Sequence, residues 1–93
     1  MLILSAEEMK EIISYKEVMK QITNAYELYE KNDFLLPDRI HINKDDDVFL
    51  YMPCFTDNAV GTKIITVFPK NRQYNEPAIQ GIMLLNDVKT GKP

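Results

Sequence analysis

The sequence predicts an α+β fold, with helices in the first third of the chain and strands in the rest. Apolar residues recur at helical spacing before Pro37 and form extended, strand-like runs after it. The composition, 45% hydrophobic and 27% charged, is that of an ordered globular chain. Because 93 residues suit one small domain without a linker or second core, we expect residues 1–93 to form a single domain.

Two helix starts are marked by the same short pattern. Ser5 stands three residues before Glu8, and Ser14 stands three residues before Glu17. In such a capping box the serine and the glutamate satisfy each other's backbone N–H groups. The pattern predicts a short helix over residues 6–13 and a longer one over residues 15–31. The apolar run ahead of the first serine, residues 2–4, is interpreted as a short edge strand.

The longer predicted helix is amphipathic. Its apolar residues form one stripe, made of Val18, Ile22, Ala25, Tyr26 and Tyr29. Aromatic residues at this spacing are typical of a packed core, so we expect both tyrosines to pack and not to contact a ligand.

The rest of the chain reads as strands separated by polar segments. Pro53 falls near the end of a continuous apolar run, which favours an edge position or a bulge there. Polar residues predict a turn over residues 43–47 and a loop over residues 69–77. The predicted strands are residues 39–42, 48–55, 62–68 and 78–86.

The predicted strands carry more apolar surface than this chain can cover. Residues 48–55 are apolar on both faces, and so are residues 78–86 except for Gln80 and Asn86, so both faces need cover. Only one substantial helix is available for that purpose. We therefore expect another chain to cover a sheet face, or the sequence to be a piece of a longer protein, or both.

Charge and cysteine content exclude several classes of function. A net charge of −3 and a pI near 5.0 provide no basic field for a phosphate backbone, so nucleic acid is not an expected partner. Cys54 is the only cysteine, which excludes an internal disulfide and a zinc site built on several cysteines. No apolar stretch approaches the roughly 20 residues that span a bilayer. We expect no membrane association, no metal and a cytoplasmic location, and we interpret the acidic run at residues 45–47 as a solvated turn.

Three basic side chains of the strand region are candidates for a site. Lys63 interrupts an apolar strand face, where it either extends its ammonium to water or stands in a recess as a cation for a carboxylate or for proton transfer. Arg39 either forms a surface pair or clamps a carboxylate with two hydrogen bonds. His41 shares the alternation of Arg39, but a lone histidine without ligand spacing is weak evidence for a site. The residues alone indicate a possible anion-binding pair, Arg39 and Lys63, and name no reaction.

Several blocks of the sequence, taken in order, resemble the amino-terminal region of the ornithine cyclodeaminase/μ-crystallin family. They are LILSAEE, ISYKEVMKQITNAYELY, LLPDRIHI, FLYMP, GTKIITVFPKN and PAIQGIMLLNDVKTGKP, and they span essentially the whole chain. The resemblance implies a mixed β-sheet packed against one or two N-terminal helices, with a sheet face completed by the partner of a homodimer. It also implies that a Rossmann domain holding NAD or NADP belongs to the full-length enzyme. Since the glycine fingerprint of that domain is absent from residues 1–93, we expect this segment to bind no cofactor and to be inactive in isolation.

The resemblance also assigns roles to residues of this chain. It places Arg39 and Lys63 at contacts with the substrate carboxylate, Lys63 also in catalysis, and Met52 in the wall of the same pocket. The implied chemistry is oxidation of an amino acid at Cα by the nicotinamide, as in conversion of ornithine to proline, or an amino-acid dehydrogenase or imine reductase reaction. Leu50 stands where ornithine-processing members tend to carry a glutamate, which argues against ornithine as the substrate. The alternative is a non-enzymatic, μ-crystallin-like binding or dimerisation module.

Overall fold

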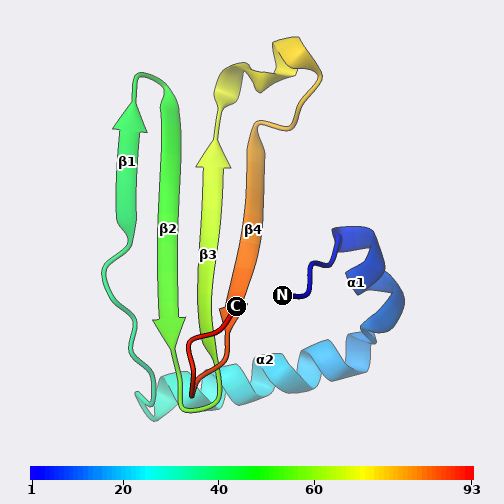
Figure 1. Cartoon of the computed structure of the whole chain (residues 1–93), viewed down its shortest axis with the longest axis vertical. Helices are drawn as coiled ribbons and strands as arrows, with labels where there is room; N and C mark the ends of the chain where they lie inside the picture. The colour runs from blue at the N-terminus through cyan, green and yellow to red at the C-terminus, as the bar shows by residue number, and fades with distance from the viewer. The chain divides into compact units, whose positions relative to one another are not determined.

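The computed structural model describes all residues, 1–93, as two helices followed by a four-stranded sheet (Figure 1). This confirms the predicted α+β class. The elements are α1 (Ala6–Ile12), α2 (Tyr15–Glu30), β1 (Ile40–Lys44), β2 (Asp47–Phe55), β3 (Val60–Val67), the 3-10 helix η1 (Pro69–Tyr74) and β4 (Ile79–Asn86).

The chain divides into two compact units, which we call the helical unit, Met1–Phe34, and the sheet unit, Leu35–Pro93. Each unit has its own network of internal contacts. The expectation of one domain over residues 1–93, with the sheet packed against the helices, stays a prediction.

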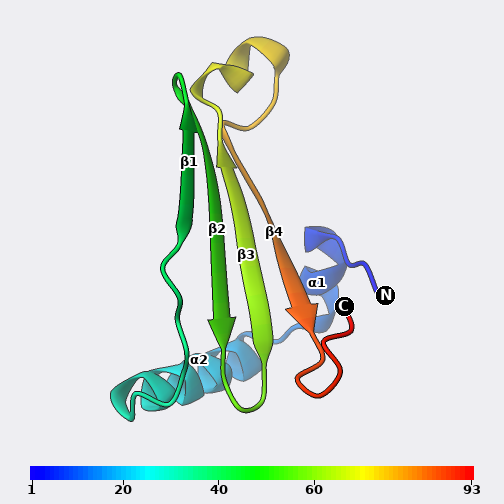
Figure 2. The same ribbon diagram turned by 60° about the vertical axis from the view of Figure 1, so that its left-hand side comes forward.

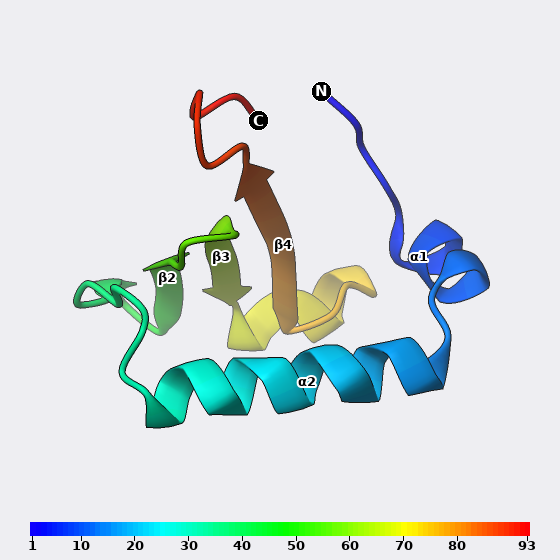
Figure 3. The ribbon, with the colours of Figure 1, turned by 90° about the horizontal axis from the view of Figure 1, so that it is seen from below.

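The helical unit begins both of its helices as predicted. The hydroxyl of Ser5 accepts a hydrogen bond from the backbone N–H of Glu8 at 3.2 Å, and the Glu8 carboxylate accepts one from the Ser5 N–H at 2.7 Å. Ser14 and Glu17 repeat the arrangement at the start of α2. Figure 3 shows α2 as one unbroken helix that follows α1 after a short break. Neither helix combines the length and the apolar character needed to cross a membrane.

The apolar run ahead of α1 is not a strand. Residues 2–4 belong to no β-element, and Leu2 and Ile3 are about four-fifths exposed, at 81% and 78%. An edge strand requires a neighbouring strand to pair its backbone N–H and C=O groups, and no strand of the structure pairs with this run. The prediction of a short edge strand at this position was wrong.

The sheet is a simple meander in the order β1-β2-β3-β4, and every neighbouring pair is antiparallel (Figure 2). It is therefore not the mixed sheet that we expected. The physical reason lies in the connections. Residues 45–46 join β1 to β2, and residues 56–59 join β2 to β3. Links this short return the chain beside itself in the opposite direction, whereas parallel neighbours need a crossover of a dozen or more residues.

Pro53 lies where β2 has lost its neighbour on one side. β1 pairs with β2 only as far as Tyr51, opposite Ile40, and beyond that a single bridge joins Leu35 to Phe55. The N–H of Phe55 donates to Leu35, so the nitrogen of Pro53, two residues earlier, faces the same unpaired side. The missing donor of the proline leaves no ladder bond unmade, which agrees with the predicted local edge position.

The long connection between β3 and β4 contains the 3-10 helix η1, where a polar loop was predicted. Its ends are closed by hydrogen bonds from the backbone N–H of Phe68 to the carbonyl of Ala78 and from the Asn71 amide to the carbonyl of Pro77. The first turn carries Pro69, whose fixed φ suits the start of a helix.

Neither unit contains a side chain that is buried. The strand β4 is exposed along almost its whole length, including Ile79, Ile82 and Leu85 at 64–65%. Exposed apolar surface of this extent is typical of a surface that another part of a protein covers. The prediction that the sheet faces need cover is thus consistent with the structure, and the identity of the cover stays a prediction.

Candidate functional site

Lys63 stands at the centre of a row of side chains that crosses three strands. Its register partner on β2 is Met52, and its partner on β4 is Met83. Residues directly opposite one another in an antiparallel sheet point to the same face, with Cβ atoms about 4.5–5.5 Å apart. The lysine is therefore flanked by a methionine on each side.

The predicted site residue Arg39 lies at the edge of this row. It comes one residue before Ile40, whose partner on β2 is Tyr51, so continuing the register would place Arg39 opposite Met52. The irregular segment between Leu35 and β1 begins here, so the sheet ladder itself does not hold Arg39. Both Arg39 and Lys63 are exposed, whereas Met52 is half-buried.

The face of the sheet that carries Lys63, which we call the cation face, has a one-sided charge distribution. Within the paired strands it consists of His41, Asn43, Val48, Leu50, Met52, Cys54, Gly61, Lys63, Ile65, Val67, Ile79, Gly81, Met83 and Leu85. This set contains no carboxylate. The only acidic residue in the four strands, Asp47, is the partner of Lys44 and points to the opposite face.

The two candidate cations have no acidic partner. The one ion pair of the chain joins the Lys70 ammonium to the Asp46 carboxylate at 3.1 Å, and both side chains are exposed. Arg39 and Lys63 take part in none. A cation without a protein carboxylate nearby is free to bind the carboxylate of a ligand.

The structure brings together part of what the sequence predicted. Met52 and Lys63 are direct neighbours, whereas only His41 lies in the edge strand β1 and Arg39 precedes that strand by one residue. Met83 was missed as a member of the row. The sequence carried no signal for it, because the pairing of β3 with β4 depends on a register across an eleven-residue connection.

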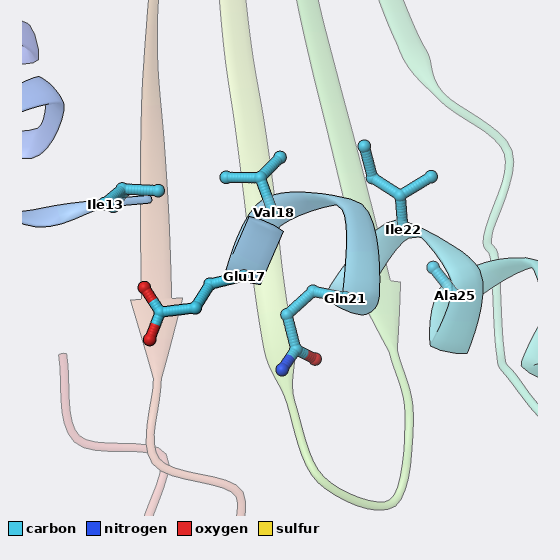
Figure 4. Close-up of a pocket in the computed structure, with 6 residues that line it drawn as sticks. All are labelled: Ile13, Glu17, Val18, Gln21, Ile22 and Ala25. Atoms are coloured by element: carbon cyan, nitrogen blue, oxygen red, sulfur yellow. The ribbon is translucent and has the colours of Figure 1, made fainter. Parts of the chain in front are cut away.

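Two shallow hollows lie on the helical unit and involve none of these residues. One, of about 430 Å³, is lined by Ile13, Glu17, Val18, Gln21, Ile22 and Ala25. Figure 4 shows Val18 and Ile22 rising from one side of α2, with the polar ends of Glu17 and Gln21 directed away from them. The other, of about 240 Å³, is lined by Ala25, Tyr26 and Tyr29. Both are shallow parts of the apolar stripe of α2 and bring no group of catalytic chemistry together.

Residues 1–93 lack the usual dinucleotide-binding motif. Binding by the usual route needs a glycine-rich turn between a strand and a helix of a βαβ unit. Here every strand pair is antiparallel, and the three glycines are isolated at positions 61, 81 and 91. No three side chains of the metal-binding types gather in one place either.

Comparison with solved structures defines the class of protein. The fold matches the archaeal "alanine dehydrogenase dimer w/bound NAD" with a TM-score of 0.89 and 28% sequence identity, over 99% of this chain and 29% of that one. It also matches the Thermococcus litoralis Delta(1)-pyrroline-2-carboxylate reductase in complex with NADH and L-proline. That TM-score is 0.89 with 31% identity, over 100% of this chain and 30% of that one.

The family follows from the sequence profile. Residues 1–93 match the Ornithine cyclodeaminase/mu-crystallin family over their whole length, and the chain belongs to this family. Among curated relatives, a Delta(1)-pyrroline-2-carboxylate reductase of Bacillus cereus is 30% identical over 100% of this chain and 30% of its own length. The alanine dehydrogenase of Archaeoglobus fulgidus is 28% identical over 99% of this chain and 29% of its own length. The chain therefore spans a little under a third of the relatives that it matches.

Proposed function

We propose that residues 1–93 form the amino-acid-binding part of an NAD(P)-dependent enzyme that oxidises or reduces the carbon–nitrogen bond of a small amino or cyclic imino acid. The observation that carries the proposal is the pairing of Lys63 with Met52 on a sheet face that has no carboxylate. Arg39 lies one residue beyond the end of the adjoining strand.

In this proposal the cations bind and orient the substrate. The planar guanidinium of Arg39 suits two parallel hydrogen bonds to a carboxylate, and the Lys63 ammonium adds a second charge on the same face. Lys63 also has the chemistry to exchange a proton with the reacting substrate. Met52 supplies an adaptable apolar surface against the hydrocarbon part.

The neighbouring side chains favour an apolar substrate over ornithine. Leu50 lies two residues from Met52 on the same face, and its partner on β3 is Ile65. Neither could pair with a distal ammonium, and burying that group unpaired would be costly. The names of the relatives, reductases of a cyclic imine and a dehydrogenase of alanine, support the same choice. We therefore favour a dehydrogenase or imine reductase reaction over cyclisation of ornithine.

A homodimer and a separate nicotinamide site complete the proposal. Exposed apolar residues of the sheet, together with the structural relative that is described as a dimer, support a second copy as the cover of the sheet outside the row at Lys63. Since residues 1–93 lack the usual dinucleotide-binding motif, the NAD or NADP would be held by other residues of the natural-length, cytoplasmic enzyme. The isolated segment would then be inactive.

Turnover by the natural-length protein tests the proposal. With NADH or NADPH and pyrroline-2-carboxylate, or with NAD or NADP and alanine or proline, Lys63→Ala should lower kcat/KM by about 100-fold or more, the range that loss of a proton-transfer group produces. Arg39→Ala should act mainly by raising KM, because it removes a contact with the carboxylate.

Two exposed basic residues of the connection to β4, Lys70 and Arg72, provide matched controls. Lys70→Ala and Arg72→Ala should leave both kinetic constants within about twofold, because exposed charges away from a site contribute little. Near-normal kinetics in Lys63→Ala would overturn the assignment. Substrate binding without any turnover, with every nucleotide, would support the non-enzymatic module instead.

A further inference from the structure

Met83 is in direct register with Lys63, on the strand β4. The two side chains therefore share the cation face, as Met52 does from the other side of the lysine. When a ligand binds Lys63 through its carboxylate, the atoms attached to that carboxylate lie over the nearest side chains of this face, Met52 and Met83. The three strands thus present one cation between two thioethers.

The Met83 sulfur lies over a glycine of the neighbouring strand. Gly61 lies two residues before Lys63 on the cation face, and a Cβ built there would come 3.9 Å from the Met83 Sδ and 3.4 Å from the Leu85 Cδ2. The thioether of Met83 therefore lies beside the bare backbone of Gly61. Gly61 is two residues before Lys63 on the cation face, so this thioether lies on the same face as the lysine.

Packing within the sheet unit does not explain Met83. Its side chain is 62% exposed, so it contributes little packing to the sheet unit itself. Ile82, the preceding residue, points to the opposite face and is exposed to a similar degree, 65%. The two residues differ in that only Met83 stands beside a cation. Methionine is flexible and polarizable, which suits contact with the hydrocarbon part of a ligand.

We infer that Met83 is a specificity-determining residue, whose thioether forms the wall on the β4 side of Lys63 and limits the size of the substrate's hydrocarbon part. The inference rests on the proposed amino-acid site. In this inference, the space between Met83 and Met52 selects substrates whose hydrocarbon part is small, such as a five-membered ring.

The test compares two cyclic imino acids, pyrroline-2-carboxylate and its six-membered homologue, in the natural-length enzyme. Met83→Ala should shift the ratio of kcat/KM for the six-membered over the five-membered ring upward by about tenfold, since one methylene in an apolar pocket discriminates by about that factor or more. The change should appear mainly in KM. Ile82→Ala, on the opposite face, should leave the ratio unchanged.

A second pair of variants keeps the test decisive if the alanine variant unfolds. Met83→Gln keeps the length of the side chain and suits an exposed position, yet it should raise KM for both rings severalfold, whereas Ile82→Gln should not. Suppose that the wild-type enzyme turns over either ring, and that the Met83 and Ile82 variants change the kcat/KM ratio or the KM equally. The role of Met83 would then be overturned, while the proposed function would stand. A wild-type enzyme inactive on both rings, and on alanine and proline, would overturn the proposed function and this inference with it.

Discussion

The helical unit and the sheet unit differ in how far apart in the sequence the residues lie that determine their structure. In the helical unit, α1 and α2 each begin at a serine whose cap partner is three residues away. In the sheet unit, β3 faces β4 across η1, and Lys63 meets a partner twenty residues further on. Local signals can therefore be read along the chain, whereas the arrangement of the candidate site depends on contacts that no local signal specifies.

The two units also differ in how closely their side chains and backbone are surrounded by other parts of the chain. The caps of the helices are exposed and bordered by solvent. Within the sheet, neighbouring strands leave fixed spaces, as the two strand glycines demonstrate. Changes in the sheet should consequently have larger effects than changes in the helices, and three predictions test this difference.

The largest effect is expected at Gly81. A Cβ at this position would lie 3.1 Å from the carbonyl oxygen of Ile64 and 3.3 Å from the Ile65 Cγ1, so the neighbouring backbone must move. Gly81→Ala should lower the free energy of unfolding by about 1–3 kcal/mol, as overpacking does. Chemical denaturation measures the loss, and hydrogen exchange should locate it in β3 and β4.

Gly61→Ala is the matched control for this prediction. Its Cβ would come no closer than 3.4 Å to Leu85, an ordinary van der Waals distance. The free energy of unfolding should therefore change by less than about 0.5 kcal/mol, as at a tolerant surface position. Equal losses at both glycines would show that the spacing of the strands does not decide the effect.

An intermediate effect is expected at the cap of α2. Ser14→Ala removes the hydroxyl that accepts the Glu17 N–H at 3.2 Å and should cost about 1 kcal/mol. The consequence should be fraying of the first turn, seen as faster amide exchange at residues 15–18 with unchanged exchange in the sheet. Ser14→Asp, which keeps a capping acceptor, should restore protection. Loss of sheet protection in Ser14→Ala would contradict the local character of this signal.

The smallest effect is expected from acid. The side-chain hydrogen bond from Ser14 lowers the pKa of Glu17, and the backbone hydrogen bond from Ser5 lowers the pKa of Glu8. A carboxylate whose pKa is lower in the folded state stabilises the fold at pH values above its pKa in the unfolded chain, which is about 4.3 for glutamate. That stabilisation is lost as the pH falls through the lowered value.

Circular dichroism at 222 nm, followed as the pH is lowered below about 4, measures this loss of helix. Glu17→Gln should remove the share of the pH-dependent loss of helix that is due to Glu17, because the amide does not titrate in this range. A helical signal in that variant with the wild-type pH dependence would show that the cap carboxylate is not responsible.

Prediction from the sequence succeeded where a short segment specifies its own structure. The starts of α1 and α2 were expected within a residue, because the capping boxes are complete in sequence. The alternation along β2 correctly separated Leu50 and Met52 from Tyr51. The strand expected at residues 2–4 and the mixed character of the sheet were wrong, because both depend on which strands pair, a property that a single segment does not contain.

The candidate site shows the same division. Lys63, Arg39 and Met52 were singled out from chemical type and family resemblance, and their roles stay predictions that mutagenesis can test. By itself the sequence determined which elements form and which side chains alternate to one face, since φ/ψ preferences, caps and periodicity act between near neighbours. Only the tertiary structure decided that Met52 and Met83 flank Lys63 and that no carboxylate shares their face. The physical reason is that strand register is set by hydrogen bonds between distant segments, and a slip of one residue would turn every side chain of a strand to the other face.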